Sequence, residues 1–191
     1  YSLHLIFHIN WTVPVDPRPS LDLRPFNLLD EKFSLSSLIF NRTVRLEFTK
    51  ERYDKYNRTL AYIFFESRNI NREIVENGFA NYYFYDGRDK YSDSLEDAWS
   101  ECINNGINLC EPSDNKCKEC IIVNSVSISN SCDFSCDVTN WTIKEEGRGK
   151  FIFSDVLESN KQIRFELDLA NSGGSLFLWD ENGKLILWQA N

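Results

Sequence analysis

The chain is predicted to fold as an α+β unit followed by an all-β unit, and three observations predict this. Over residues 1–110, segments with strand-like alternation are interleaved with segments of helical periodicity. Over residues 120–191 the pattern is strand-like almost throughout. Between them, residues 111–119 are mostly polar and include Pro112, which is typical of a linker. A length of 191 residues suits one large or two small domains, and the change in pattern favours two with these boundaries.

The first unit is predicted to contain three strands and three helices. Apolar residues alternate with other residues in three segments, which predicts half-buried strands over residues 2–15, 43–48 and 58–65. The spacing of apolar residues predicts helices over residues 27–40, 71–77 and 93–105. Gly78 and Gly106 follow the second and third of these helices, where glycine commonly ends a helix.

The second unit is predicted to consist of strands joined by turns. Apolar runs predict strands over residues 121–129, 141–144, 151–153, 162–169, 175–179 and 184–188. The last two are separated by a turn that contains Asn182-Gly183, and Asn-Gly between two apolar runs is a strong hairpin signal.

Composition limits the classes of protein that the chain can belong to. Hydrophobic residues make up 42%, which is enough for buried cores, and no run approaches the roughly 20 apolar residues of a transmembrane helix. The net charge of -8 argues against a protein that binds nucleic acid through its overall charge. The chain contains no Met and begins with no signal-peptide pattern, so we expect either a cleaved leader or a fragment.

Six cysteines allow more than one interpretation. Cys102 and Cys110 precede a cluster in which the ligand spacing suits a zinc site, formed by Cys117, Cys120, Cys132 and Cys136. The same four residues suit disulfides that stabilise a small domain in an oxidising compartment, and free thiols are the third alternative. No His lies nearby, and the residues between Cys120 and Cys132 suit a strand. These observations favour disulfides.

Two neighbouring stretches of the first unit carry the most specific motifs. They are Asp54-Lys55-Tyr56-Asn57-Arg58-Thr59-Leu60-Ala61-Tyr62 and Asn71-Arg72-Glu73-Ile74-Val75-Glu76-Asn77-Gly78-Phe79-Ala80. They resemble the D-K-Y-G-R-x-L-A-Y signature and the following N-x-x-L-V-x-x-G-x-A helix of the staphylococcal nuclease (thermonuclease) family. The resemblance implies an OB-fold barrel with helices. Because only three of the five barrel strands are visible, we expect the first strands to lie before Tyr1 in the complete protein.

The resemblance also implies metal-assisted hydrolysis of phosphodiester bonds in DNA or RNA. In the family, aspartates hold Ca²⁺, a glutamate is thought to activate water, and two arginines stabilise the developing charge. By position, Arg58 corresponds to one catalytic arginine, and Lys55 and Tyr56 correspond to residues that bind a terminal phosphate of the substrate. Asp16 corresponds to one metal-binding carboxylate.

The chain departs from the family pattern upstream of the signature. Trp11 stands where the second arginine is expected and Pro19 where the glutamate is expected, while an Asp-Gly-Asp-Thr metal turn would precede Tyr1. The matching residues also fit a structural interpretation, in which Arg58 pairs with Asp54 or Glu66 and Asp16 is a solvated loop residue.

The second unit has its own resemblance, carried by residues 137–146 and by the closing hairpin of residues 176–185. Both resemble the lamin-tail domain, an immunoglobulin-like β-sandwich. A sandwich of about 70 residues has a marginal core, so cysteine cross-links are expected to stabilise it. The resemblance suggests a module for targeting or adhesion, with an unknown protein or envelope partner.

Two functions are consistent with these observations. Arg58, Lys55 and Tyr56 favour a secreted or envelope-associated, calcium-dependent endonuclease, of which this chain carries an incomplete active site. Trp11 and Pro19 favour a catalytically dead nuclease domain that serves as a binding scaffold. The sequence does not decide whether the chain is an enzyme.

Overall fold

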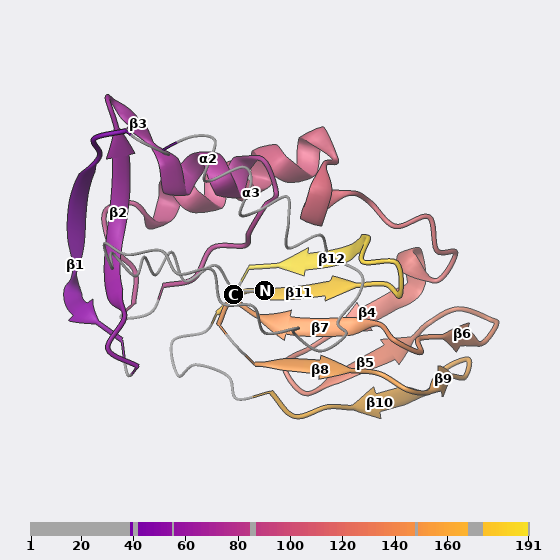
Figure 1. The fold of residues 1–191 in the computed structure, drawn as a ribbon. Coiled ribbons are helices and arrows are strands. Elements are labelled where there is room, and N and C mark those ends of the chain that lie inside the picture. Colours follow the sequence, from indigo (N-terminus) through magenta and orange to yellow (C-terminus); the bar gives the residue numbers. More distant parts are fainter. Residues whose placement is uncertain are drawn as a thin grey trace, which may run out of the picture.

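The structure is a computed structural model that describes residues 39, 42–54, 56–84, 87–147, 149–167 and 174–190. The predicted strand over residues 2–15 lies outside these residues, as does all of the predicted helix over residues 27–40 except Ile39, which is helical. The described part is mainly β, with two α-helices and several open antiparallel sheets (Figure 1). Neither of these α-helices is long and apolar enough to cross a membrane.

The first sheet contains β1 (Arg45–Tyr53), β2 (Thr59–Phe65) and β3 (Arg68–Asn69), in that order. Leu46 pairs with Ile63, and the register shifts between Phe48 and Tyr53. β1 is an edge strand among the described residues, so the sheet does not close into a barrel within them. The expected OB barrel is therefore observed only as an open sheet.

Two helices pack beside this sheet, and their bounds agree with prediction to within one residue. α2 (Ile70–Glu76) begins at Asn69, whose side chain accepts hydrogen bonds from the backbone N–H groups of Asn71 and Arg72. α3 (Ser92–Asn105) ends at Gly106, whose φ of 61° lies in the left-handed region that glycine favours. Arg72 links the helices through a 2.7 Å ion pair with Glu101.

Two larger sheets make up most of the second half. One has the order β10-β5-β4 and the other has the order β12-β11-β7-β8, while β6 pairs with β9. The strands are β4 (Ile121–Val123), β5 (Ser127–Asn130), β6 (Cys136–Asp137), β7 (Thr142–Glu145), β8 (Lys150–Ile152), β9 (Val156–Leu157), β10 (Gln162–Arg164), β11 (Leu176–Trp179) and β12 (Leu185–Gln189). Buried residues from both larger sheets belong to one hydrophobic core.

One predicted strand is wrong. Residues 121–129 form a hairpin of β4 and β5 and not a single strand. The chain turns at Asn124 because its side-chain oxygen accepts hydrogen bonds from the backbone N–H groups of Val126 and Ser127. By contrast, the predicted hairpin around Asn182-Gly183 is present as β11 and β12.

The two halves share a second hydrophobic core, which contains residues of β2, α2, α3, β11 and β12. Trp99 of α3 meets Phe177 of β11 edge to face, with ring centroids 5.1 Å apart. The Trp179 indole N–H donates to the Leu109 carbonyl at 2.8 Å. In Figure 1, β11 and β12 (yellow) lie between the helices and the rest of their own sheet. The closing hairpin therefore belongs to the cores of both halves.

The segment predicted as a linker pairs with β12. The Leu185 N–H donates to the Glu111 carbonyl at 2.7 Å, and the Ser113 N–H donates to the Leu185 carbonyl at 2.9 Å. The Ser113 hydroxyl also hydrogen-bonds to the Asp180 carboxylate. Residues 111–113 are thus fixed against the hairpin.

Candidate functional site

The family signature forms the tip of the β1–β2 hairpin. Tyr53 pairs with Thr59 at the ends of the strands, and the Asp54 N–H donates to the Arg58 carbonyl at 2.9 Å. Asn57 adopts a φ of 60°, in the left-handed region. The family signature has glycine at this position, and Asn is one of the few other residues that tolerate this conformation. The substitution therefore preserves a sharp turn.

Asp54 organises this turn through both of its carboxylate oxygens. Oδ1 accepts hydrogen bonds from the backbone N–H groups of Tyr56, at 2.8 Å, and of Arg58, at 2.9 Å. Oδ2 accepts from the Arg58 Nε at 2.6 Å and forms an ion pair with the Arg58 Nη2. One carboxylate thus fixes both the loop backbone and the guanidinium.

The Asp54 carboxylate is held in its ionised form. Its side chain is only 1% exposed, and this burial acts to raise its pKa. The hydrogen bonds from the Arg58 side chain, and then from the Arg58 and Tyr56 backbones, outweigh burial and lower the pKa of Asp54 to about 2. A charged, buried partner therefore faces Arg58 throughout the physiological pH range.

Arg58 presents one side of its guanidinium away from Asp54. The group lies over the Tyr56 ring, 5.0 Å from its centroid, and the Arg58 side chain is 26% exposed. Among the described residues, the Arg58 Nη1 has no hydrogen-bond acceptor, whereas Nε and Nη2 face Asp54. Tyr56 is 54% exposed. A guanidinium and an aromatic ring at an exposed turn can together contact a phosphate and a base.

The structure brings together two of the four predicted catalytic, substrate-binding and metal-binding residues. Arg58 and Tyr56 are in contact, while Lys55 and Asp16 lie outside the described residues. Of the two carboxylates considered as structural partners for Arg58, the structure selects Asp54 over Glu66. Sequence reasoning did not identify the contacts of Asp54 with the loop backbone. The sequence signal that could have indicated these contacts is an aspartate four residues before the arginine.

The described residues offer no converging oxygen ligands for a metal ion. The only described group of three or more His, Cys, Asp or Glu side chains with converging ligand atoms consists of the sulfurs of Cys120, Cys132 and Cys136. These sulfurs belong to disulfides. The described residues alone therefore do not fit a calcium ion, which would need ligands elsewhere in the protein.

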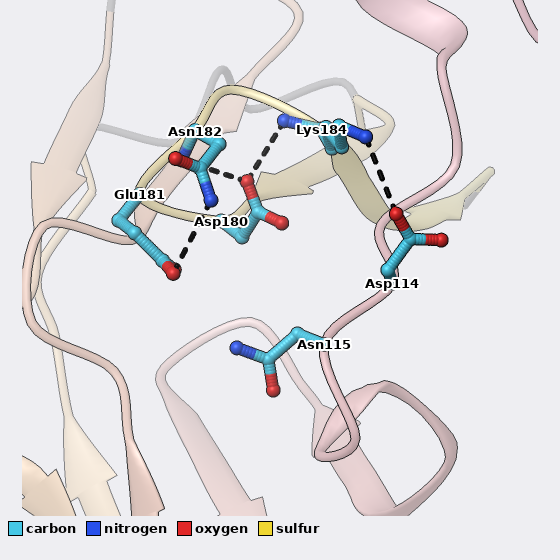
Figure 2. A pocket seen from close by; sticks show the side chains of 6 residues that line it. All are labelled: Asp114, Asn115, Asp180, Glu181, Asn182 and Lys184. Atoms are coloured by element: carbon cyan, nitrogen blue, oxygen red, sulfur yellow. Dashed lines mark hydrogen bonds and ion pairs between the residues drawn. The ribbon is translucent and has the colours of Figure 1, made fainter.

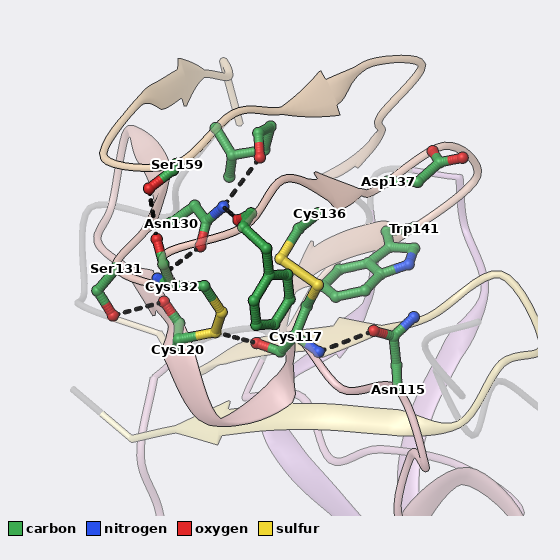
Figure 3. The surroundings of a disulfide bond; sticks show 12 residues. Asn115, Cys117, Cys120, Asn130, Ser131, Cys132, Cys136, Asp137, Trp141 and Ser159 are labelled. Atoms are coloured by element: carbon green, nitrogen blue, oxygen red, sulfur yellow. Dashed lines mark hydrogen bonds between the residues drawn. A yellow bond between two sulfur atoms is a disulfide. The ribbon is translucent and has the colours of Figure 1, made fainter.

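All six cysteines are paired in disulfides, and none is a free thiol. The pairs are Cys102–Cys110, Cys117–Cys136 and Cys120–Cys132, with Cα atoms 5.8, 5.9 and 5.3 Å apart. The last two connect the end of the predicted linker and the start of the second half to Cys136 and Cys132, which follow β5 (Figure 3). The structure thus shows the disulfide alternative for these four residues and not four zinc-binding thiolates.

A pocket near the closing hairpin is lined by acidic and amide side chains (Figure 2). The lining residues are Asp114, Asn115, Asp180, Glu181, Asn182 and Lys184. Contacts within the protein occupy all three carboxylates. Asp180 accepts hydrogen bonds from the backbone N–H groups of Asn182 and Lys184. Asp114 forms a 3.3 Å ion pair with Lys184, and Glu181 accepts a hydrogen bond from the Trp141 indole N–H. The cluster thus fixes the hairpin against the segment before it.

Comparisons with known proteins agree with the hairpin motif. The family described as "Staphylococcal nuclease homologue" matches residues 14–111, about half of the chain. The chain is 33% identical over 98 residues to a thermonuclease of Staphylococcus intermedius, covering 51% of this chain and 58% of the relative. It is 32% identical over 85 residues to a thermonuclease of Staphylococcus hyicus, covering 44% and 50%.

A third relative is an uncharacterized endonuclease of Haemophilus influenzae, which is 41% identical over 49 residues, or 26% of each chain. The chain spans about half the length of the two thermonucleases that it matches. The match includes the β1–β2 hairpin, with Asp54 and Arg58, and both described α-helices. The chain belongs to the family of staphylococcal nuclease homologues.

Proposed function

We propose that the protein is a calcium-dependent endonuclease that hydrolyses phosphodiester bonds of DNA or RNA. The observation that carries this proposal is the Arg58 guanidinium, which is held at an exposed hairpin tip with Nη1 unoccupied by the described residues. The two relatives named thermonuclease support the same class of reaction.

Each residue of the hairpin tip has a proposed role. Arg58 stabilises the negative charge that develops on the phosphate oxygens, because a fixed cationic donor is worth more in a partly desolvated site than in water. Tyr56 and Lys55 bind a terminal phosphate of the substrate. Calcium would polarise the phosphate when bound. Asp16 is the proposed ligand within this chain, and the described residues contain no converging group of three or more carboxylates.

The second half is proposed to be a lamin-tail-like, immunoglobulin-like β-sandwich over residues 120–191, and the first an OB-fold domain completed by strands outside the described residues. The sandwich would bind an unknown protein or envelope partner. Three disulfides are typical of proteins in oxidising compartments, which supports a secreted or envelope-associated location.

The second candidate function is a catalytically dead, nuclease-derived scaffold. Trp11 and Pro19 occupy the positions expected for the second arginine and the glutamate, which favours this candidate. Loss of such groups typically costs about 100- to 1000-fold each in rate. The scaffold candidate therefore predicts cleavage close to background.

Replacing Arg58 by alanine tests the catalytic role. The full-length Arg58→Ala variant is expected to cleave single-stranded DNA about 100-fold or more slowly than wild type in the presence of calcium. Arg68→Ala is the matched control, because Arg68 also pairs with a carboxylate through Nε and Nη2 but lies outside the signature. Equal rates for Arg58→Ala and wild type would remove Arg58 from the mechanism.

A further inference from the structure

The Asp54 carboxylate, which holds the Arg58 guanidinium, has no role of its own in the proposed reaction. We propose that Asp54 is a positioning residue, which fixes the Arg58 guanidinium in the orientation needed for phosphodiester hydrolysis. The proposal rests on the proposed function of Arg58 and adds a second residue to its site.

The two oxygens of Asp54 perform separate tasks. Oδ1 accepts two backbone N–H groups and so fixes the path of the loop through Tyr56 and Arg58. Oδ2 contacts the Arg58 Nε and Nη2, which restricts rotation of the planar guanidinium. Since the backbone and the side chain of Arg58 are fixed by the same buried group, the position of Nη1 is determined before substrate arrives.

Fixing Arg58 in advance should increase the rate. A free arginine side chain has many rotamers, and this freedom is lost when the side chain binds a phosphate. Displacing a reacting group by about 1 Å can cost about 100-fold in rate. An arginine already held by Asp54 avoids much of both costs, and this benefit appears mainly in kcat.

A second pair in the same half shows what an ordinary surface pair looks like. Arg68 Nε donates to Glu73 at 2.6 Å, and the Arg68 Nη2 pairs with the same carboxylate, so the donor atoms are those that Arg58 uses. Glu73 is more exposed than Asp54, and within the described residues no backbone N–H group donates to its carboxylate. The Arg68–Glu73 pair is therefore a control for loss of an arginine–carboxylate contact.

Asp54→Asn separates the two tasks of the carboxylate. The amide oxygen can still accept the two backbone N–H groups, but the amide nitrogen would be a donor facing the Arg58 Nε. In the full-length protein, we expect kcat to fall about 100-fold while KM changes only a few-fold. Glu73→Gln should leave both constants within twofold of wild type.

A double variant tests whether Asp54 acts through Arg58. If it does, Asp54→Asn combined with Arg58→Ala should be no slower than Arg58→Ala alone. A wild-type rate in Asp54→Asn would overturn the proposal, and so would a further loss in the double variant equal to that in the single variant. Asp54→Glu, which keeps an acceptor for the guanidinium, should recover part of the rate.

One measurement on the wild type needs neither a variant nor activity. By NMR, the Arg58 Nε–H should exchange with water more slowly than that of Arg52, which stacks on Phe48 and has no described hydrogen-bond partner. Equal exchange rates would show that Asp54 does not hold Arg58. An inactive wild-type protein would contradict the proposed function instead, and the exchange rates would still decide whether Asp54 fixes the guanidinium.

Discussion

Asp54 contributes to folding as well as to the proposed chemistry, because its buried carboxylate joins residues on both sides of a tight turn. The motif assigned Arg58 and Tyr56 to the site by resemblance, and the structure places the two side chains in contact. It could not decide between Asp54 and Glu66 as the partner of Arg58, since both lie within reach along the chain. The choice depends on the loop conformation, which Asn57 helps to set with its positive φ.

The pKa of Asp54 gives a prediction for stability against pH. The pKa is lowered to about 2 in the folded protein, whereas an unfolded aspartate titrates at about 4. The stabilisation is therefore complete above pH 4 and is lost as pH falls from about 4 through about 2, with a size of roughly 2 kcal/mol. Urea unfolding measured from pH 2 to 7 should give a higher free energy of unfolding for wild type than for Asp54→Asn. This difference should be constant above pH 4 and should shrink as pH falls from about 4 to about 2. A pH-independent difference would contradict the assignment.

At the scale of elements, the predictions were confirmed where a local sequence signal marks the end of a helix or the turn of a hairpin. Gly106 ends α3 and Asn182-Gly183 turns the last hairpin, and both features are present. Prediction failed at residues 121–129, where the Asn124 side chain accepts backbone hydrogen bonds and so turns the chain inside an apolar run. The two-residue strands β3, β6 and β9 were not predicted, because two residues are too few to show an alternating pattern.

The β11–β12 hairpin links the two halves, so damage to it should affect both. Phe177 is fully buried against Trp99 of α3, and Phe177→Ala should lower the free energy of unfolding by about 3–5 kcal/mol. Hydrogen exchange should then accelerate in α3 as well as in β11. Ile152→Ala is the control, because Ile152 is exposed and should change stability by less than about 0.5 kcal/mol. Acceleration confined to the second half would show that the halves unfold independently.

At the scale of the whole molecule, the sequence predicted two units but not their shared core. All four residues of β11 are buried, and Phe177 and Trp179 belong to the core shared with α3 while Leu176 and Leu178 belong to the core of the second half. An apolar run predicts that both faces of a strand are buried, but it does not indicate which elements pack against each face. The segment taken for a linker pairs with β12 through backbone hydrogen bonds, which no side-chain pattern indicates.

The central claim concerns the activity of the complete protein, and cleavage with and without calcium tests it most directly. Purified full-length protein should cut single-stranded DNA or RNA when calcium is present and stop when a chelator is added, because the metal is proposed to polarise the phosphate. The products should carry new ends within the strand, as expected for an endonuclease. Folded protein that leaves both substrates intact in calcium would contradict the account and favour the scaffold.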